Sequence, residues 1–306
     1  MTDAKKPMAE ANRISSMLNT VLGRDRFPVK VDELALEYSR QCFSDSPIDK
    51  VHGEDLDGFD GLLKVNKARS KWLVLYNSAT PSEGRKRFTI AHEFGHYLLH
   101  RHQQDLFECG DGDIETGDNN ERDIEAEADL FASTLLMPLD DFRRQVDGQP
   151  VSFDLLGHCA DRYGVSLTAA ALRWTEIAPN RAILVASRDD HMLWAKSNKA
   201  ALRSGAYFAT RKNTIELPHD ALAHSYNAFD STDTRTGRAQ PWFAREPAGM
   251  PITEMTRVAG QYDYTLTLLL LPEAEWQGTR HDDEEPEEDT YDRCIRNGQY
   301  PVGDRS

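Results

Sequence analysis

The sequence lacks the features that mark secreted and membrane proteins. It contains 4 cysteines in 306 residues. They are widely separated and form no C-x-x-C pair, which favours free thiols in a reducing compartment over a disulfide framework. No apolar run approaches the ~20 residues that a membrane helix requires, and the N-terminal residues lack the apolar segment of a secretory signal. These absences predict a cytoplasmic protein that does not bind a membrane.

Basic residues do not outnumber acidic ones in this sequence. The chain has 36 Lys and Arg against 51 Asp and Glu, a formal net charge of −15. Because a nucleic acid is itself a polyanion, this balance argues against direct nucleic-acid binding and favours a basic partner. Part of the acidic excess lies in the run DDEEPEEDTYD, which predicts a disordered tail over residues 276–306. The chain also has no Gly-rich phosphate loop, no G-x-S-x-G elbow and no internal repeat.

What the chain does contain is an H-E-x-x-H motif at residues 92–96. Residues four apart in a helix lie on one face, so His92 and His96 can offer their ring nitrogens to one zinc ion. Glu93 then lies beside the metal rather than on it, where a general base must be to take a proton from the attacking water. The motif therefore predicts two zinc ligands and a catalytic carboxylate.

The surroundings of the motif favour a site over a chance arrangement on a solvent-facing helix. Two histidines and a glutamate inside a buried helix are unfavourable unless they are paired or bound to a metal. The predicted helix is apolar around most of its circumference, as a buried helix is. Its apolar residues are Phe88, Ile90, Ala91, Phe94, Tyr97, Leu98 and Leu99.

A third protein ligand is needed, and a second helix predicted over 118–138 offers it. Glu125 is the preferred ligand, with Glu127 and Glu121 as alternatives. Asp129, one turn beyond Glu125, is predicted to accept the second ring N–H of a ligating histidine and so to fix its orientation. A solvent-facing acidic stripe is the competing interpretation, which the apolar residues of this helix disfavour.

The two blocks together carry a family resemblance. The segment RKRFTIAHEFGHYLLH, followed further on by EAEADLFASTLLMP, resembles the ImmA/IrrE family of metallo-endopeptidases over residues 59–139. The resemblance implies a compact zincin-like domain that depends on zinc, with His92 and His96 as ligands, Glu93 as catalytic acid and base, and Glu125 as third ligand. Several members act on helix-turn-helix transcriptional repressors and relieve repression.

Local patterns place further elements ahead of the motif. Polar segments at 40–58 and 103–118 predict loops. Cys109 in the second could in principle bind a metal, but a lone cysteine in a loop more often has no such role. The remaining expectations are a helix within 1–28 that ends near Gly23, a helix at 31–39 with Asp32 as its N-cap, strands at 59–66 and 71–77, and Thr80 as the N-cap of the motif helix.

Beyond residue 138 the signals weaken. Residues 153–177 predict two helices with a turn at Gly164, an outline that resembles a helix-turn-helix. The second helix offers only Arg173 as a basic residue, so a structural hairpin is the better interpretation. Strand-like runs follow at 182–188, 191–197, 206–211 and 262–271. Isolated residues such as His191, His219, His224 and Trp242 are given no role.

The predicted class is α+β. We expect a zincin-like metallopeptidase domain at 1–150, in which a small sheet packs on the motif helix. A helical-hairpin connector follows at 151–178, then a β-rich domain at 179–275 for which a sensory role is one interpretation, and then the acidic tail at 276–306. The predicted function is a zinc-dependent endopeptidase that cleaves a protein partner, such as a basic DNA-binding repressor. The alternative is a metal-binding regulatory or toxin-type protein that docks on a repressor or antitoxin without proteolysis.

Overall fold

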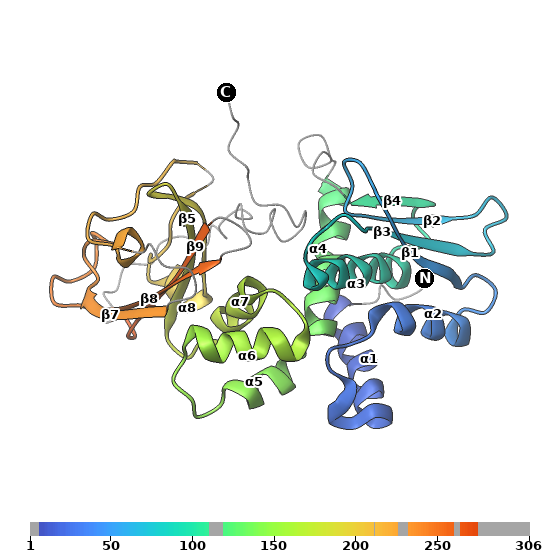
Figure 1. Ribbon diagram of the computed structural model, residues 1–306, viewed down its shortest axis with the longest axis horizontal. Helices are drawn as coiled ribbons and strands as arrows, with labels where there is room; N and C mark the ends of the chain where they lie inside the picture. The colour runs from blue at the N-terminus through green and yellow to red at the C-terminus, as the bar shows by residue number, and fades with distance from the viewer. Residues whose placement is uncertain (1–5, 110–118, 211, 226–231, 260–263, 275–306) are drawn as a thin grey trace. The chain divides into compact units, whose positions relative to one another are not determined.

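The computed structural model describes residues 6–109, 119–210, 212–225, 232–259 and 264–274 (Figure 1). Contacts within the chain divide them into two compact units. The described residues of 1–149 and 158–166 form the first unit, and those of 150–157 and 167–294 form the second. Helices and strands occur in both, so the predicted α+β class is confirmed. The predicted acidic tail at 276–306 lies outside the described residues.

The helices and strands follow one another along the whole described chain. Up to residue 146 they are α1 (Pro7–Leu22), the 3₁₀ helix η1 (Gly23–Arg26), α2 (Val31–Cys42), β1 (Ile48–Glu54), β2 (Gly61–Val65), β3 (Trp72–Asn77), α3 (Glu83–Leu99), β4 (Leu106–Cys109), α4 (Asn119–Leu136) and α5 (Leu139–Val146). Those that follow are α6 (Phe153–Tyr163), α7 (Leu167–Ile177), β5 (Arg181–Arg188), β6 (His191–Ser197), α8 (Lys199–Arg203), the 3₁₀ helix η2 (Leu222–Ser225), β7 (Thr232–Arg238), β8 (Pro251–Ala259) and β9 (Tyr264–Leu271).

A four-stranded sheet forms in the first unit, in the order β1-β3-β2-β4. Strand β1 runs parallel to β3, whereas β2 is antiparallel to both β3 and β4. The strands predicted at 59–66 and 71–77 are confirmed as β2 and β3. The loops predicted at 40–58 and 103–118 are wrong where β1 and β4 form, because these strands depend on partners distant in the sequence rather than on a strong local pattern.

The helices that precede the sheet begin and end near the predicted positions. Helix α1 ends at Leu22, and Gly23 follows with a φ of 62°, a positive value that glycine adopts readily because it has no Cβ atom. Helix α2 begins at Val31 with Lys30 at its N-cap, so the N-cap predicted at Asp32 is wrong. The Asp32 carboxylate lies instead in the first helical turn, where it interacts favourably with the positive end of the helix dipole.

The N-cap predicted for the motif helix is also wrong. Helix α3 is capped by Ser82, two residues after Thr80, and the Ser82 hydroxyl accepts a hydrogen bond from the backbone N–H of Arg85. The Arg85 guanidinium pairs with Asp60 at 2.6 Å. Asp60 adjoins β2, so this ion pair joins the helix to the sheet. It favours Ser82 over Thr80 as the N-cap of the helix.

Helix α3 is surrounded by other elements of the first unit. It lies along one face of the sheet, against β2 and β3, and it also contacts α2 and α4 (Figure 1). Every residue from Thr89 to Leu98 is buried, and Phe94, Tyr97 and Leu98 belong to a core shared with the sheet and with α1, α2 and α4. The buried helix predicted from the apolar pattern is confirmed, and the polar groups of the motif lie inside it.

Gly95 determines how closely α4 approaches α3. A Cβ atom at position 95 would lie 3.1 Å from the ring of Phe131 and 3.3 Å from the backbone of Ala128. Only glycine therefore fits this crossing without displacing its neighbours. The close approach brings the acidic residues of α4 within reach of the histidines of α3.

The second unit contains a five-stranded antiparallel sheet in the order β6-β5-β9-β8-β7. Three of the four predicted strands are confirmed as β5, β6 and β9, whereas β7 and β8 were not predicted. The strand predicted at 206–211 is wrong over the described residues 206–210, which follow α8 as an irregular loop. Its alternating apolar residues pack as a loop, with the Phe208 ring stacked on Phe243 at a centroid distance of 4.9 Å.

The two helices predicted within 153–177 are confirmed as α6 and α7, and Gly164 between them has a φ of 61°. None of the helices in the described ranges combines the length and apolar composition that crossing a bilayer would require.

Candidate metal centre

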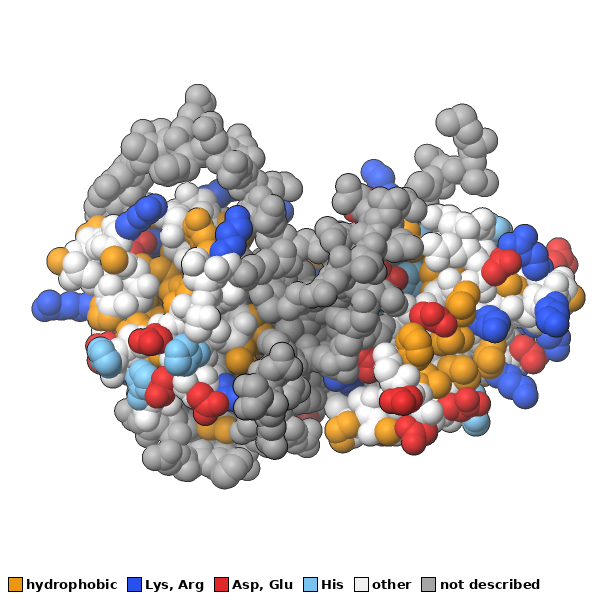
Figure 2. All heavy atoms as spheres, turned by 90° about the horizontal axis from the view of Figure 1, so that it is seen from above, with side chains coloured by type: hydrophobic (Ala, Val, Ile, Leu, Met, Phe, Trp, Pro, Cys, Tyr) orange, Lys and Arg blue, Asp and Glu red, His pale blue; other side chains and the backbone are white. Residues whose placement is uncertain are grey.

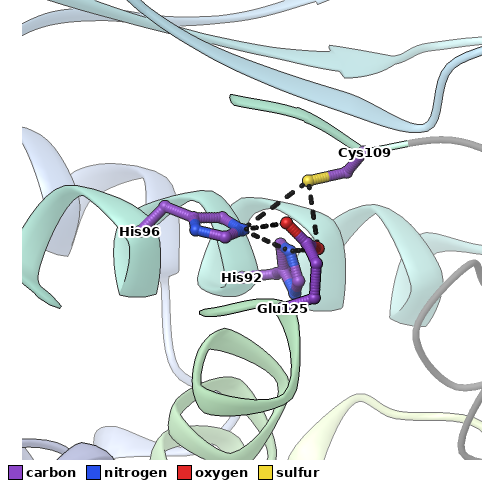
Figure 3. Close-up of side chains that lie close together, drawn as sticks. All are labelled: His92, His96, Cys109 and Glu125. Carbon is purple, nitrogen blue, oxygen red and sulfur yellow. Dashed lines mark hydrogen bonds and ion pairs between the residues drawn. The ribbon is translucent and has the colours of Figure 1, made fainter. Parts of the chain in front are cut away.

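The two motif histidines and Glu125 meet where α3 crosses α4 (Figure 3). The Nε2 atoms of His92 and His96 are 2.9 Å apart. One carboxylate oxygen of Glu125 lies 3.1 Å from His92 Nε2, and the other lies 3.2 Å from His96 Nε2. Both imidazoles are buried. The structure thus brings the three predicted ligands to one point inside the first unit.

Asp129 lies at the other edge of the His92 ring. Its Oδ1 is 2.8 Å from His92 Nδ1, which is the contact expected of an acceptor that orients a metal-binding imidazole. Of the alternative ligands, Glu127 bonds a different histidine, and the side chain of Glu121 lies outside the described residues. Among the described acidic side chains of α4, Glu125 is the one within 3.2 Å of both motif histidines.

A third histidine, which was not predicted, extends the arrangement. His100 Nδ1 lies 3.1 Å from His96 Nδ1, and His100 Nε2 lies 2.9 Å from Glu127 Oε2. His100 is buried, whereas the Glu127 side chain is half-exposed. The signal was present in the sequence, since His92, His96 and His100 recur every four residues on one helix face.

Burial keeps the His96 and His100 imidazoles neutral. In His92 burial alone would lower the pKa, but the contacts with Cys109, Asp129 and Glu125 outweigh this effect and raise the pKa well above its ordinary value. Burial lowers the pKa of His96 to about 4, although the nearby Glu125 carboxylate opposes this effect. Burial also lowers the pKa of His100 below its ordinary value, against the opposing effect of Glu127. Burial alone would raise the pKa of Glu125, but the two motif histidines outweigh it and the net shift is downward. At neutral pH His96 and His100 are therefore neutral, and the Glu125 carboxylate is ionised.

Glu127 and Asp129 determine which ring nitrogens carry protons, because each carboxylate accepts a hydrogen bond from one of the histidines. Glu127 only accepts hydrogen bonds, so His100 donates from Nε2 and its Nδ1 accepts from His96 Nδ1–H. Asp129 likewise requires a proton on Nδ1 of His92. In their neutral forms His92 and His96 then each have a lone pair on Nε2, and these two atoms face each other and the Glu125 carboxylate. Several acceptors without a proton between them fit a bound cation.

Glu93 lies next to this cluster, completely buried on the sheet side of α3. Neither of its carboxylate oxygens has a hydrogen-bond partner among the described residues. Burial raises its pKa to about 8, although the positive charge of a protonated His92 would lower it. A buried carboxylate without a partner is unfavourable in a purely structural core.

The end of the sheet covers Glu93. Gly61 in β2 and Cys109 in β4 are register partners across the ladder. A Cβ atom at Gly61 would lie 2.5 Å from Glu93 Oε1 and 2.5 Å from Thr89 Cγ2, so glycine is required for β2 to pass this close. Cys109 was expected to lie in a loop without a role, yet its Sγ joins His92, His96 and Glu125 in a group of ligand atoms within 4.8 Å of one another.

A buried H-E-x-x-H helix on a small mixed sheet, with a glutamate from a second helix beside its histidines, defines a metallopeptidase-type, zincin-like domain. The family model for the IrrE N-terminal-like domain, Peptidase_M78, matches residues 49–175. The match covers the motif helix and the second helix, and it agrees with the resemblance found in the sequence.

Comparisons of the whole chain give the fold without a function. No curated protein matches it. A solved structure described as a transcriptional regulator of Mycobacterium tuberculosis is similar, with a TM-score of 0.51 and 16% sequence identity. The similarity covers 86% of this chain and 76% of the other. At this identity the likeness extends to the fold alone.

Proposed function

We propose that the protein is a zinc-dependent endopeptidase that cleaves a protein partner, a basic DNA-binding repressor, and so relieves repression. The family of residues 49–175 supports the peptidase class. The ligand set of two imidazoles and one carboxylate is the one that several zinc peptidases use.

The observation that carries the proposal is the Glu93 carboxylate. A site that only holds a metal for stability or docking gains nothing from a second buried carboxylate that no described side chain pairs with. A peptidase needs a base beside the ligands, because the attacking water must lose a proton. The environment of Glu93, buried and with a pKa raised to about 8, suits a group that takes up a proton and returns it.

Each residue then has a distinct part. His92, His96 and Glu125 would hold zinc, which supplies a Lewis acid that lowers the pKa of water and polarises a carbonyl. Glu93 takes the proton of the attacking water and delivers it to the leaving amine. Asp129 holds the His92 ring in the orientation that directs Nε2 toward the cluster.

The sheet edge supports an extended peptide as substrate. Strand β4 stands at one edge of the sheet, paired with β2, and its last residue adjoins the site. An extended peptide can add to such an edge through main-chain hydrogen bonds, as many protease substrates do. The exposed Glu108 in β4 would favour a basic segment.

The charge of the chain supports a basic protein partner rather than a nucleic acid. The formal net charge is −15, and on the face in Figure 2 the Lys and Arg side chains of the described residues lie among Asp and Glu side chains. A repressor is basic because it binds a polyanion. We infer a regulatory role in the cytoplasm for this chain, whose fold is similar to that of a transcriptional regulator.

The test is cleavage of the small DNA-binding protein encoded beside the gene. The purified chain, loaded with zinc, is incubated with that protein, and fragments are identified by mass spectrometry. We expect discrete fragments from the wild type and from Glu273→Gln, an exposed control, and none from Glu93→Gln, which should still retain zinc. Equal cleavage by Glu93→Gln would show that Glu93 is not the base.

A docking protein without peptidase activity is the competing function. It would form a stable complex with the same DNA-binding protein and leave it intact. Size-exclusion chromatography of the incubated mixture separates the two, since a peptidase releases fragments and an adaptor co-elutes with its uncut partner.

A further inference from the structure

Cys109 is the last residue of the edge strand β4, and it faces the cluster of predicted ligands. Its side chain is buried. The sulfur lies 3.8 Å from His96 Nε2 and 3.9 Å from Glu125 Oε2. Figure 3 shows the Sγ atom directed at the other three side chains from the side of β4, while they approach from α3 and α4. The four ligand atoms therefore surround one point.

The separations fit a four-coordinate site. In tetrahedral zinc with bonds of about 2.0 Å to nitrogen or oxygen and about 2.3 Å to sulfur, neighbouring ligand atoms are about 3.3 Å apart, and about 3.6 Å when one of them is sulfur. The nitrogen and oxygen atoms here are 2.9 to 3.2 Å apart, and the two sulfur distances are 3.8 and 3.9 Å. Shifts of a few tenths of an ångström would satisfy these five separations, and the sixth pair, His92 and Cys109, lies within 4.8 Å.

The charges of the four side chains also favour a bound divalent cation. Two neutral imidazoles, one carboxylate and one thiolate neutralise a divalent cation, which favours a buried site. The unpaired and fully buried Glu93 carboxylate beside them is an independent sign that this pocket receives a positively charged group. A cysteine that merely filled space would be expected among apolar side chains, not against a histidine and a carboxylate.

We propose that Cys109 is a fourth protein ligand whose thiolate closes the metal site, so that the protein rests in an inactive form until Cys109 is displaced. The proposal rests on the peptidase function above. When the thiol binds a divalent cation, the S–H bond breaks, the sulfur keeps the electron pair and the proton goes to solvent. Catalytic zinc sites keep one position free for water, whereas sites with four protein ligands are structural.

The position of Cys109 allows such displacement. Strand β4 has only four residues and lies at an edge, and Cys109 ends it. Its carbonyl accepts one backbone hydrogen bond, from the N–H of Asp60 at 2.8 Å. Moving Cys109 away opens the end of a short edge strand and leaves the pairing of β2 with β3 intact. The closed site can therefore open without unfolding the core.

Cobalt substitution tests the ligand directly. The full chain is loaded with Co²⁺ and its absorption spectrum is recorded for the wild type, Cys109→Ser, Cys109→Ala and Cys159→Ser. Cys159 is a buried free cysteine in α6 that is not in the ligand group, and so it is the matched control. We expect a near-ultraviolet thiolate-to-cobalt charge-transfer band in the wild type and in Cys159→Ser, and its loss in both Cys109 variants, with the visible cobalt bands retained.

Peptidase activity tests the closure. The Cys109 variants should cleave the DNA-binding protein faster than the wild type does, provided that thermal melting shows them folded. Cobalt bound without the charge-transfer band would overturn the ligand assignment and leave the peptidase proposal standing. If the band is lost in the Cys109 variants but no Glu93-dependent cleavage occurs, Cys109 is a ligand, whereas the peptidase function and its inhibition by Cys109 are both overturned. Equal cleavage by wild type and variants would overturn the closure alone.

Discussion

Replacing Gly61 by alanine should separate catalysis from metal binding. Position 61 lies in β2 directly over the motif helix, where an added Cβ would be 2.5 Å from Glu93 Oε1 and 2.5 Å from Thr89 Cγ2. Neither neighbour has free space, because Glu93 and Thr89 are both buried. The three candidate metal ligands are not among the residues of the three nearest atoms, which belong to Glu93 and Thr89.

The size of the effect follows from the overlap. Ordinary van der Waals contact begins at 3.4 Å, so the Glu93 carboxylate would have to move by about 0.9 Å, and a misplacement of about 1 Å costs on the order of 10²-fold in rate. Alanine is favoured over glycine in a strand by roughly 0.5–1 kcal/mol, which limits the loss of stability. We therefore expect kcat/KM to fall on the order of 10²-fold while zinc content is unchanged.

The assay compares kcat/KM on the proposed repressor, zinc content by elemental analysis, and the melting temperature. Gly237→Ala is the matched control, since Gly237 also lies in a strand and has open space where the Cβ would be added. Activity in Gly61→Ala equal to that of Gly237→Ala would refute the reasoning, because Glu93 would then not need its present position. Loss of zinc together with activity would assign the effect to the ligands instead.

Two further changes test parts of the first unit. Asp129→Asn should weaken zinc binding by ~10–100-fold, since an amide orients His92 less firmly than a carboxylate; competition with a chelator measures this, and an unchanged affinity would argue against the orienting role. Burial alone would raise the pKa of Asp141, but hydrogen bonds from Arg162 and Tyr163 outweigh it and lower that pKa from 3.8 to about 2. Asp141→Asn should therefore reduce the free energy of unfolding at pH 7 by about 2 kcal/mol. Because the folded-state pKa is the lower one, this difference should persist above about pH 4 and disappear as the pH falls toward about 2. Urea titrations at several pH values measure it, and a difference that grew on acidification would contradict the assignment.

Much of the candidate metal centre could be predicted because it depends on helical periodicity. His92 and His96 are one turn apart, and Glu125 and Asp129 are one turn apart, so each pair shares a face whatever the rest of the chain does. The apolar residues around the motif predicted its burial, and burial in turn required that the polar groups have partners. These are local properties, and the structure reproduces the local arrangement.

The parts that could not be predicted depend on contacts between distant segments. Strand β4 has four residues and pairs with β2 only through the fold, so nothing near Cys109 in the sequence indicated a strand or a place beside the histidines. Two hydroxyl residues, Thr80 and Ser82, could have capped α3. Ser82 is the cap in the structure, where Arg85 also forms an ion pair with Asp60. The partner of His100 was missed for a related reason, since Glu127 faces away from Glu125 on an ideal helix and reaches the histidine with a long side chain.

Two glycines explain why the motif alone does not make the site. Gly95 lets α4 approach α3 closely enough for Glu125 to reach both histidines, and Gly61 lets β2 pass over Glu93. In an open helix the same H-E-x-x-H would hold its side chains in water, where Glu93 would keep its ordinary acidity. The approach of helix and sheet therefore does two things at once, completing the ligand set and removing water from the carboxylate. We infer that the chemistry of this domain is controlled as much by the spacing of its backbones as by the residues of the motif.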